Sequence, residues 1–285
     1  MNTRTKPRVQ NVGQGSMEAH LAIPPPPFIV YYGVRRFLLV AESFSLDRSK
    51  RPYRRLSATL ILARKAPVHL YVGENRVLSG RAMLIAPGVQ RQNISAINSE
   101  VAIFDVSIGT PEYELLQPIL RPGGVQVLDM APFAALEPLI SDAFHRRLLD
   151  DEAAFLFTSA IRLASNGRAG NLPLDRRVRQ AMEIIDQFAF DELPPETLAS
   201  QIGLSASRLR HLFREQLGCP LTRYQRWSAT WQATVLMPGT ESLTELAHQT
   251  GFYDLAHFDH AFMDIFGLTP SHLLNTSNAT LVPCL

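Results

Sequence analysis

Apolar residues recur every three or four positions in the last third of the chain, a pattern that predicts amphipathic helices. Between Leu193 and Trp227, two such patterns flank a short break at Gly203-Leu204-Ser205. The apolar stripes comprise Leu198, Ala199 and Ile202 before the break, and Leu209, Leu212, Phe213 and Leu217 after it. Gly203 suits the positive φ that ends a helix, and Ser205 can accept a bond from a backbone N–H that opens the next one. The spacing therefore predicts two short helices joined by a tight turn.

The outward face of the second predicted helix carries small residues first and cations later. Its residues are Ala206, Ser207, Arg210, His211 and Arg214. Small residues let a backbone approach a DNA groove, where a guanidinium can bind guanine O6 and N7 while another reaches a phosphate. This layout is typical of a helix-turn-helix DNA reader, although an ordinary solvated charged face is the alternative.

The same spacing returns downstream, with one residue added in the turn. Gly203, Leu209, Leu212, Phe213 and Gly218 correspond to Gly251, Phe258, Ala261, Phe262 and Gly267. Ser242 and Glu245 form a capping-box pattern, and Asp254 can cap the helix after the second turn. A linker helix from the Tyr224 region is expected between the two units. The repeat predicts an all-α region of two helix-turn-helix units.

Two such units joined by a helix resemble the AraC/XylS family of transcription regulators. The resemblance covers about residues 175–275 and rests on "IGLSASRLRHLFREQLG", "TRYQRW" and "LAHQTGFYDLAHFDHAFMDIFGLTPSHL". By position, it implies that Ser207, Arg210 and His211 read bases in the first unit. It assigns the same role in the second unit to Leu255, Ala256, Asp259 and His260.

The charges of the two units differ sharply. From Trp227 to Leu285 there is no Lys or Arg, whereas five acids occur there: Glu241, Glu245, Asp254, Asp259 and Asp264. Between Leu204 and Arg226 the balance is reversed, with Arg208, Arg210, Arg214, Arg223 and Arg226 against Glu215. Because phosphate attraction supplies most non-specific affinity, we expect the first unit to dominate DNA binding. Arg214, Arg223 and Arg226 are candidates for the DNA backbone or for packing. The second unit is a weak reader, a packing partner or a protein-contact surface.

The region from Phe28 to Ile108 is predicted to be β. Short segments rich in Val, Ile, Leu and aromatic residues, such as "SATLILAR" and "VAIFDVSI", are broken by turns that contain Gly. Regular short strands predict a small antiparallel β-barrel. In position this region resembles the cupin-like sensor domain of AraC-type regulators, and "GRAMLIAPGVQRQ" resembles a strand and turn of that domain. The predicted fold class is therefore α+β.

Helical periodicity from Pro111 to Ala164 predicts helices that flank the barrel and cover either it or a second subunit. A segment rich in Gly, Asn and Ser follows as a linker. We expect a disordered basic arm with a Pro spacer at 1–27, a sensor or dimerisation domain at 28–164, a linker at 165–174, the DNA-binding domain at 175–275 and a loose tail at 276–285. Up to Lys65, twelve Lys and Arg residues stand against three acids. This basic segment assists DNA binding or simply keeps the chain soluble.

Metal chemistry and catalysis are disfavoured by the residues of the predicted barrel. A cupin enzyme needs two or three His and a carboxylate, but His69 is the only histidine between residues 28 and 108. Arg91 stands where many relatives of this domain carry a histidine. It could meet an anionic ligand, but a surface arginine on a turn is the safer interpretation. We therefore expect no catalytic residues, no metal and no cofactor. Cys219 is expected to be structural, and Cys284 is given no role.

These patterns lead to one main hypothesis, a sequence-specific regulator that binds double-stranded DNA. A small-molecule effector, a homodimer partner and RNA polymerase are further candidate partners. The rival is an interaction protein whose acidic second unit no longer binds DNA. No apolar run approaches the ~20 residues that a membrane span needs. The N-terminus lacks the charge-then-apolar pattern of a signal peptide, so a cytoplasmic protein is expected.

Overall fold

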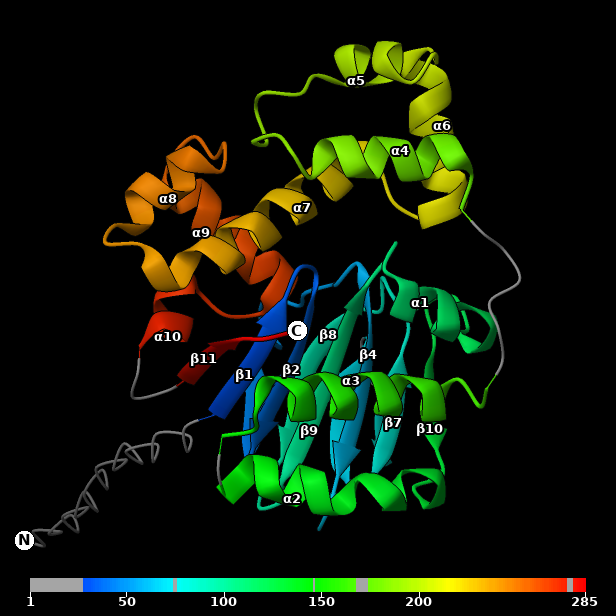
Figure 1. Ribbon diagram of the computed structural model, residues 1–285, viewed down its shortest axis with the longest axis vertical. Helices are drawn as coiled ribbons and strands as arrows, with labels where there is room; N and C mark the ends of the chain where they lie inside the picture. Colours follow the sequence, from blue (N-terminus) through cyan, green and yellow to red (C-terminus); the bar gives the residue numbers. More distant parts are fainter. Residues whose placement is uncertain (1–27, 74–75, 146, 168–173, 276–278) are drawn as a thin grey trace, which may run out of the picture.

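The computed structural model describes residues 28–73, 76–145, 147–167, 174–275 and 279–285. An N-terminal domain rich in strands lies beside a C-terminal domain of helices (Figure 1). The predicted arm at 1–27 and most of the predicted linker lie outside the described residues.

The strands form two sheets. They are β1 (Phe28–Gly33), β2 (Arg36–Ala41), β3 (Phe44–Asp47), β4 (Ser57–Ala63), β5 (Val68–Val72), β6 (Arg76–Gly80), β7 (Ala82–Ile85), β8 (Arg91–Ala96), β9 (Val101–Ser107), β10 (Val125–Leu128) and β11 (Ala279–Pro283). The larger sheet has the order β10-β7-β4-β9-β2-β1-β11, and the smaller has the order β3-β8-β5-β6. Every pairing between these strands is antiparallel except that of β1 with β11. The α+β fold class is confirmed, with two separate sheets in place of a closed barrel.

Helices cover one face of the larger sheet. In chain order they are α1 (Pro111–Leu116), the 3-10 turns η1 (Gln117–Ile119) and η2 (Ala131–Leu136), α2 (Glu137–His145) and α3 (Asp150–Ala164). Their apolar sides, with Phe133, Ile140 and Phe157, share a core with Leu60 and Phe104 of the sheet. In Figure 1, α2 and α3 lie across this face. The predicted helical stretch also contains the short strand β10, which pairs with β7.

The other face of the larger sheet belongs to a second core that continues into the C-terminal domain. Ile61, Met83 and Ile103 lie in it, together with Leu70 and other apolar residues of the smaller sheet. Phe28, Val30 and Phe37 of β1 and β2 belong to the same core as Trp231 and Phe262 of the C-terminal helices. The two domains are therefore joined by buried apolar surface as well as by the chain.

The C-terminal helices follow the predicted order. They are α4 (Arg176–Ile185), α5 (Pro195–Gln201), α6 (Ala206–Leu217), α7 (Leu221–Leu236), η3 (Met237–Gly239), α8 (Leu243–Gln249), α9 (Leu255–Phe266) and α10 (Pro270–Leu274). The predicted cap of α8 is present, since Ser242 Oγ accepts from Glu245 N at 3.3 Å. The long helix α7 connects the two units (Figure 1).

Two expectations about single segments are wrong. Arg91 is not a surface residue on a turn: it opens β8, is 1% exposed and donates from Nη2 to Thr59 Oγ1 at 2.8 Å. It is buried because the first position of β8 faces the interior, where Thr59 and Asp105 supply polar atoms. The tail is also not loose over its described part, because β11 adds to the edge of β1 in register from Phe28 with Ala279.

Candidate nucleic-acid interface

The first helix-turn-helix unit is built by local signals. Gly203 has φ of 68° and lets the chain turn after α5. Ser205 Oγ accepts from Arg208 N at 3.2 Å and so caps α6. Gly218, with φ of 67°, ends that helix in the left-handed conformation. Leu209, Leu212, Phe213 and Leu217 are buried, which fixes the orientation of the opposite face.

That opposite face is accessible, and it brings together the residues predicted to read bases. Ser207, Arg210, His211 and Arg214 are all exposed. Arg210 Nη2 lies 2.8 Å from Glu196 Oε1, with side chains 49% and 67% exposed. Such a surface ion pair contributes only about 0–1 kcal/mol, so DNA can displace it at little cost. Two acids of the described residues reduce the positive charge of this face: Glu196, the partner of Arg210, and Glu215, which lies 3.6 Å from His211.

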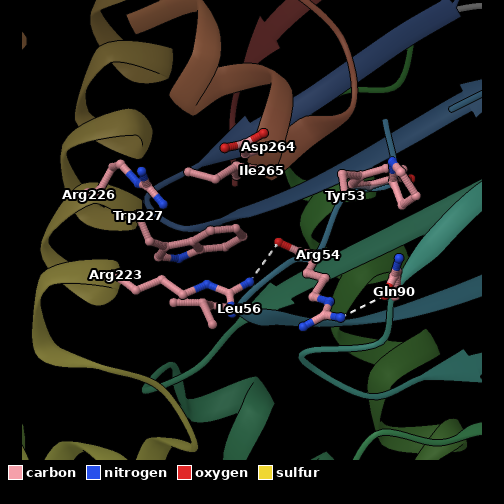
Figure 2. A pocket seen from close by; sticks show the side chains of 10 residues that line it. Tyr53, Arg54, Leu56, Gln90, Arg223, Arg226, Trp227, Asp264 and Ile265 are labelled. Atoms are coloured by element: carbon pink, nitrogen blue, oxygen red, sulfur yellow. Dashed lines mark hydrogen bonds between the residues drawn. The ribbon is translucent and has the colours of Figure 1, made fainter. Parts of the chain in front are cut away.

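The other two predicted backbone contacts, Arg223 and Arg226, lie elsewhere. Both are half-buried on α7, where they line a pocket that the N-terminal domain helps to enclose. Arg223 Nη2 donates to the backbone oxygen of Arg54 at 3.4 Å (Figure 2). Burial, and to a smaller extent the neighbouring Arg54 and Arg226, lowers the pKa of Arg223. In this arrangement, these two arginines therefore serve the domain interface.

The second unit repeats the geometry of the first. Asp254 Oδ1 accepts from His257 N at 2.7 Å and caps α9, and Gly267 ends it with φ of 80°. Of the candidate readers, Ala256 and His260 are exposed, whereas Leu255 and Asp259 are half-buried. Burial raises the pKa of Asp259 above its usual value. This face therefore presents a carboxylate where the first unit presents Arg210.

The face of α9 also contacts the N-terminal domain, through Arg51 and Arg54, which the sequence analysis did not single out. Arg51 Nη2 lies 3.2 Å from His260 Nδ1 and donates to Asp264 Oδ1 at 3.1 Å. The backbone N–H of Arg54 donates to the carbonyl oxygen of Asp264 at 3.3 Å. Charge complementarity between the basic run "RSKRPYRR" and the cation-free second unit is the signal that could have indicated this contact.

Close packing anchors the second unit on the sheets. A Cβ added at Gly267 would come within 3.0 Å of both Leu46 and Tyr53, so the approach needs glycine there. Arg55 Nη2 donates to the carbonyl oxygen of Phe266 at 3.3 Å, and the rings of Phe37 and Trp231 are 6.1 Å apart. The second unit is therefore a neighbour of the sheets, whereas α5 and α6 lie at the far end of α7 (Figure 1).

The arginines that open α4 have partners within the chain. Arg177 Nη2 lies 2.7 Å from Asp175 Oδ2, and Arg179 Nη2 lies 2.8 Å from Glu114 Oε1. Side-chain hydrogen bonds from Arg177 lower the pKa of Asp175 to about 2. Two of the three arginines in the first turn of α4 are therefore paired with carboxylates of the same chain, so their positions do not require a bound phosphate.

Metal-binding and nucleophilic groups are sparse in the part of the chain that the structure describes. Within it, no group of three or more His, Cys, Asp or Glu residues could hold a metal ion. Both cysteines are free thiols, and burial raises the pKa of Cys219 to about 11. No described helix is long and apolar enough to cross a membrane.

Comparison with known proteins agrees with this architecture. Residues 198–276 match a family model described as a helix-turn-helix domain. The chain is 34% identical over 101 residues to the arabinose operon regulatory protein of Escherichia coli K12, which is 35% of each chain. It is 31% identical over 165 residues to the HTH-type transcriptional regulator GlxA of Rhizobium meliloti, covering 55% of this chain and 49% of that one. The matches thus span from about a third to half of the relatives' lengths.

Solved structures extend the likeness to both domains. ToxT from Vibrio cholerae O395 superposes with a TM-score of 0.53 at 10% identity, covering 82% of this chain and 95% of ToxT. Wild-type ToxT of Vibrio cholerae strain SCE256, with an unsaturated fatty acid bound, superposes with a TM-score of 0.52 at 12% identity. The match covers 82% of this chain and 93% of that one. At such identity the likeness shows a shared two-domain fold. Over residues 198–276 the chain is similar to a helix-turn-helix domain, and over about a third of its length it is similar to the arabinose operon regulatory protein.

Proposed function

We propose that the protein is a sequence-specific transcription regulator that binds double-stranded DNA mainly through its first helix-turn-helix unit. In this proposal Ser207, Arg210 and His211 contact base edges, and Arg214 contacts a phosphate. The main support for this proposal is helix α6, which has an exposed face with cations and an opposite face that is buried. A rigid helix with a small residue near its start and arginines behind it suits the major groove.

Arg223 and Arg226 reach the DNA backbone, in this proposal, only when the domains separate. Both line the pocket at the domain interface, and the N-terminal domain also contacts α9. We therefore propose that the arrangement described here is the form with the lower DNA affinity. An effector would act by shifting the equilibrium between this arrangement and one in which the domains are apart.

The remaining assignments follow from the same proposal. We place the sensor or dimerisation domain at 28–164, the linker at 165–174 and the DNA-binding domain at 175–275. A homodimer and contact with RNA polymerase are consistent with a regulator of the AraC/XylS type. The protein would act where the DNA is, in the cytoplasm, without enzymatic activity or a cofactor.

The apolar pocket between the two domains has little room for an effector shaped like a fatty acid. The apolar pocket between β1, β2 and the C-terminal helices, which Arg55 also lines, holds only about 50 Å³. Typical ligand pockets hold about 300–1,000 Å³. Phe28, Phe37, Trp231 and Phe262 line it, and these rings would have to move for such a ligand to enter.

The alternative function is a protein-interaction regulator whose second unit no longer binds DNA. It is supported by the acidic α9, whose Asp264 and His260 contact Arg51 of the same chain. A helix face that engages an arginine within the chain can engage one on another protein in the same way.

Selection of bound sites from random duplex DNA with the purified full-length protein tests the proposal. A short half-site of a few base pairs is expected, because one unit reads. Two boxes about one helical turn apart would show that both units read bases. No enriched site at low salt would favour the interaction-protein alternative.

A further inference from the structure

Three guanidinium groups converge on one pocket between the two domains. The pocket has a volume of about 430 Å³, which is the size of a site for a small metabolite. The N-terminal domain supplies Arg54 and Gln90, α7 supplies Arg223, Arg226 and Trp227, and α9 supplies Asp264. In Figure 2, Arg223 reaches the backbone oxygen of Arg54, whose side chain extends to Gln90.

The positive charge of this pocket is not balanced by the residues that line it. Arg54 donates to the amide oxygen of Gln90 at 2.6 Å, and Arg223 donates to a backbone oxygen, so both partners are neutral. Among the described residues, Arg54, Arg223 and Arg226 have no carboxylate within ion-pairing distance. Asp264, the acid in the wall, is engaged by Arg51.

Two further observations indicate that the positive charge serves a ligand. The neighbouring arginines contribute to lowering the pKa of Arg223, after burial, which is the repulsion expected between close like charges. The indole N–H of Trp227 is buried without a hydrogen-bond partner in the described structure. A buried donor normally has an acceptor, and a small shift of the Trp227 ring would bring this N–H to a ligand oxygen in the pocket.

The chemistry of the wall defines the class of ligand. Guanidinium forks pair bidentately with carboxylate and phosphate groups. Because three guanidinium groups from two domains line the pocket, a ligand that pairs with all of them needs more than one anionic group. A DNA backbone fits poorly, because a rod-shaped duplex would have to enter a recess between the domains, walled by Tyr53, Trp227 and Ile265.

We propose that this pocket binds a small polyanion, with two or more carboxylate or phosphate groups, between Arg54 on one side and Arg223 and Arg226 on the other. The bound anion would join the domains and hold α9 against Arg51. It would also occupy two arginines that the proposed regulator needs for DNA. The regulatory consequence rests on the proposed function, whereas the binding site does not.

The first test measures binding of citrate and of pyrophosphate to the full-length protein by calorimetry, without DNA and at constant ionic strength. Saturable binding of either probe is expected, and the two probes distinguish a carboxylate from a phosphate ligand. Arg54→Gln should weaken binding about tenfold or more, since it removes a charge-assisted bond. Arg76→Gln, an exposed arginine of β6, is the matched control and should leave the affinity unchanged.

The second test supplies the missing charge from the protein itself. Gln90→Glu places a carboxylate beside Arg54, so it should raise the melting temperature in chloride buffer and abolish the response to the probes. Gln92→Glu, on β8 outside the pocket, should do neither. The proposal is overturned if neither probe binds wild type saturably, or if Arg54→Gln and Gln90→Glu bind as tightly as wild type. A protein that binds a probe but selects no DNA would refute the proposed function and leave the site standing.

Discussion

The two helix-turn-helix units have the same backbone arrangement, but their exposed faces carry opposite charge. Helices α6 and α9 both span 12 residues, begin at a capped N-terminus and end at a left-handed glycine. Leu209 and Phe213 in one correspond to Phe258 and Phe262 in the other, and all four are buried. Outward, however, α6 presents Arg210 where α9 presents Asp259. The candidate reading face of α6 is exposed, whereas the matching face of α9 contacts the N-terminal domain.

This difference shows that the buried positions maintain the unit while the exposed positions decide what it binds. Helices with matching buried residues and matching capping interactions have the same length and ends, whatever the charge of their exposed residues. The acidic face of α9 suits a basic turn of the N-terminal domain, and the basic face of α6 suits phosphate. The same repeat therefore presents one face that contacts the N-terminal domain and another that we propose reads DNA.

Removing one arginine from the first unit should have the largest effect. Arg210→Ala is expected to cost about 1–3 kcal/mol in binding to a selected site and to relax base preference there. Asp259→Ala, the matched position in α9, should leave affinity and preference nearly unchanged. Fluorescence anisotropy with the selected duplex and single-base variants measures both. Equal losses from the two variants would remove the asymmetry between the units.

Reversing the charge of the second unit should convert it towards the first. Replacing Asp259 and Asp264 with Arg is expected to raise non-specific affinity on the order of tenfold and to steepen its salt dependence, because new phosphate contacts release counterions. The control replaces Asp129 and Asp151 of the N-terminal domain with Arg, for the same change in net charge. The measurement is the slope of log affinity against log salt. An unaltered slope would mean that this face never meets DNA.

The caps should matter equally in the two units. Ser205→Ala and Asp254→Ala each remove the acceptor of one backbone N–H, so each should lower the free energy of unfolding by about 1 kcal/mol. Urea denaturation of both variants measures this. A cost confined to one variant would contradict the view that the two units share a skeleton.

The docking contact should have the smallest effect on stability. Arg51 and Asp264 are each 43% exposed, so Arg51→Gln is expected to cost less than about 1 kcal/mol. Deuterium uptake should nevertheless rise in residues 255–266 and stay unchanged in 206–217. The exposed Arg208→Gln is the control. Equal uptake in Arg51→Gln and wild type would show that the contact does not restrain α9.

The sequence predicted the helical units well because their signals are local. A glycine, a capping side chain and an apolar stripe lie within a few residues of each other, and each fixes the backbone beside it. The residues proposed to read bases share one exposed face of α6 for the same reason. Their contacts with DNA remain a prediction.

The features that the sequence did not locate depend on partners far along the chain. Burial of Arg91 requires β4 and β9 to supply Thr59 and Asp105. Arg223 and Arg226 line a pocket together with Arg54 and Gln90 of the N-terminal domain, a neighbourhood that no pattern near α7 records. The contact of Arg51 with α9 joins residues of both domains, so only their charges hinted at it.

Strand β11 has a consequence for the order in which the chain folds. It pairs with β1, yet it emerges from the ribosome only after the whole helical domain. Throughout synthesis, that edge of β1 has unpaired backbone groups, a state in which strands recruit foreign chains. Contacts of such sequence separation also form slowly. We therefore expect the larger sheet to be completed last, so that truncations after α10 should yield protein that aggregates during expression.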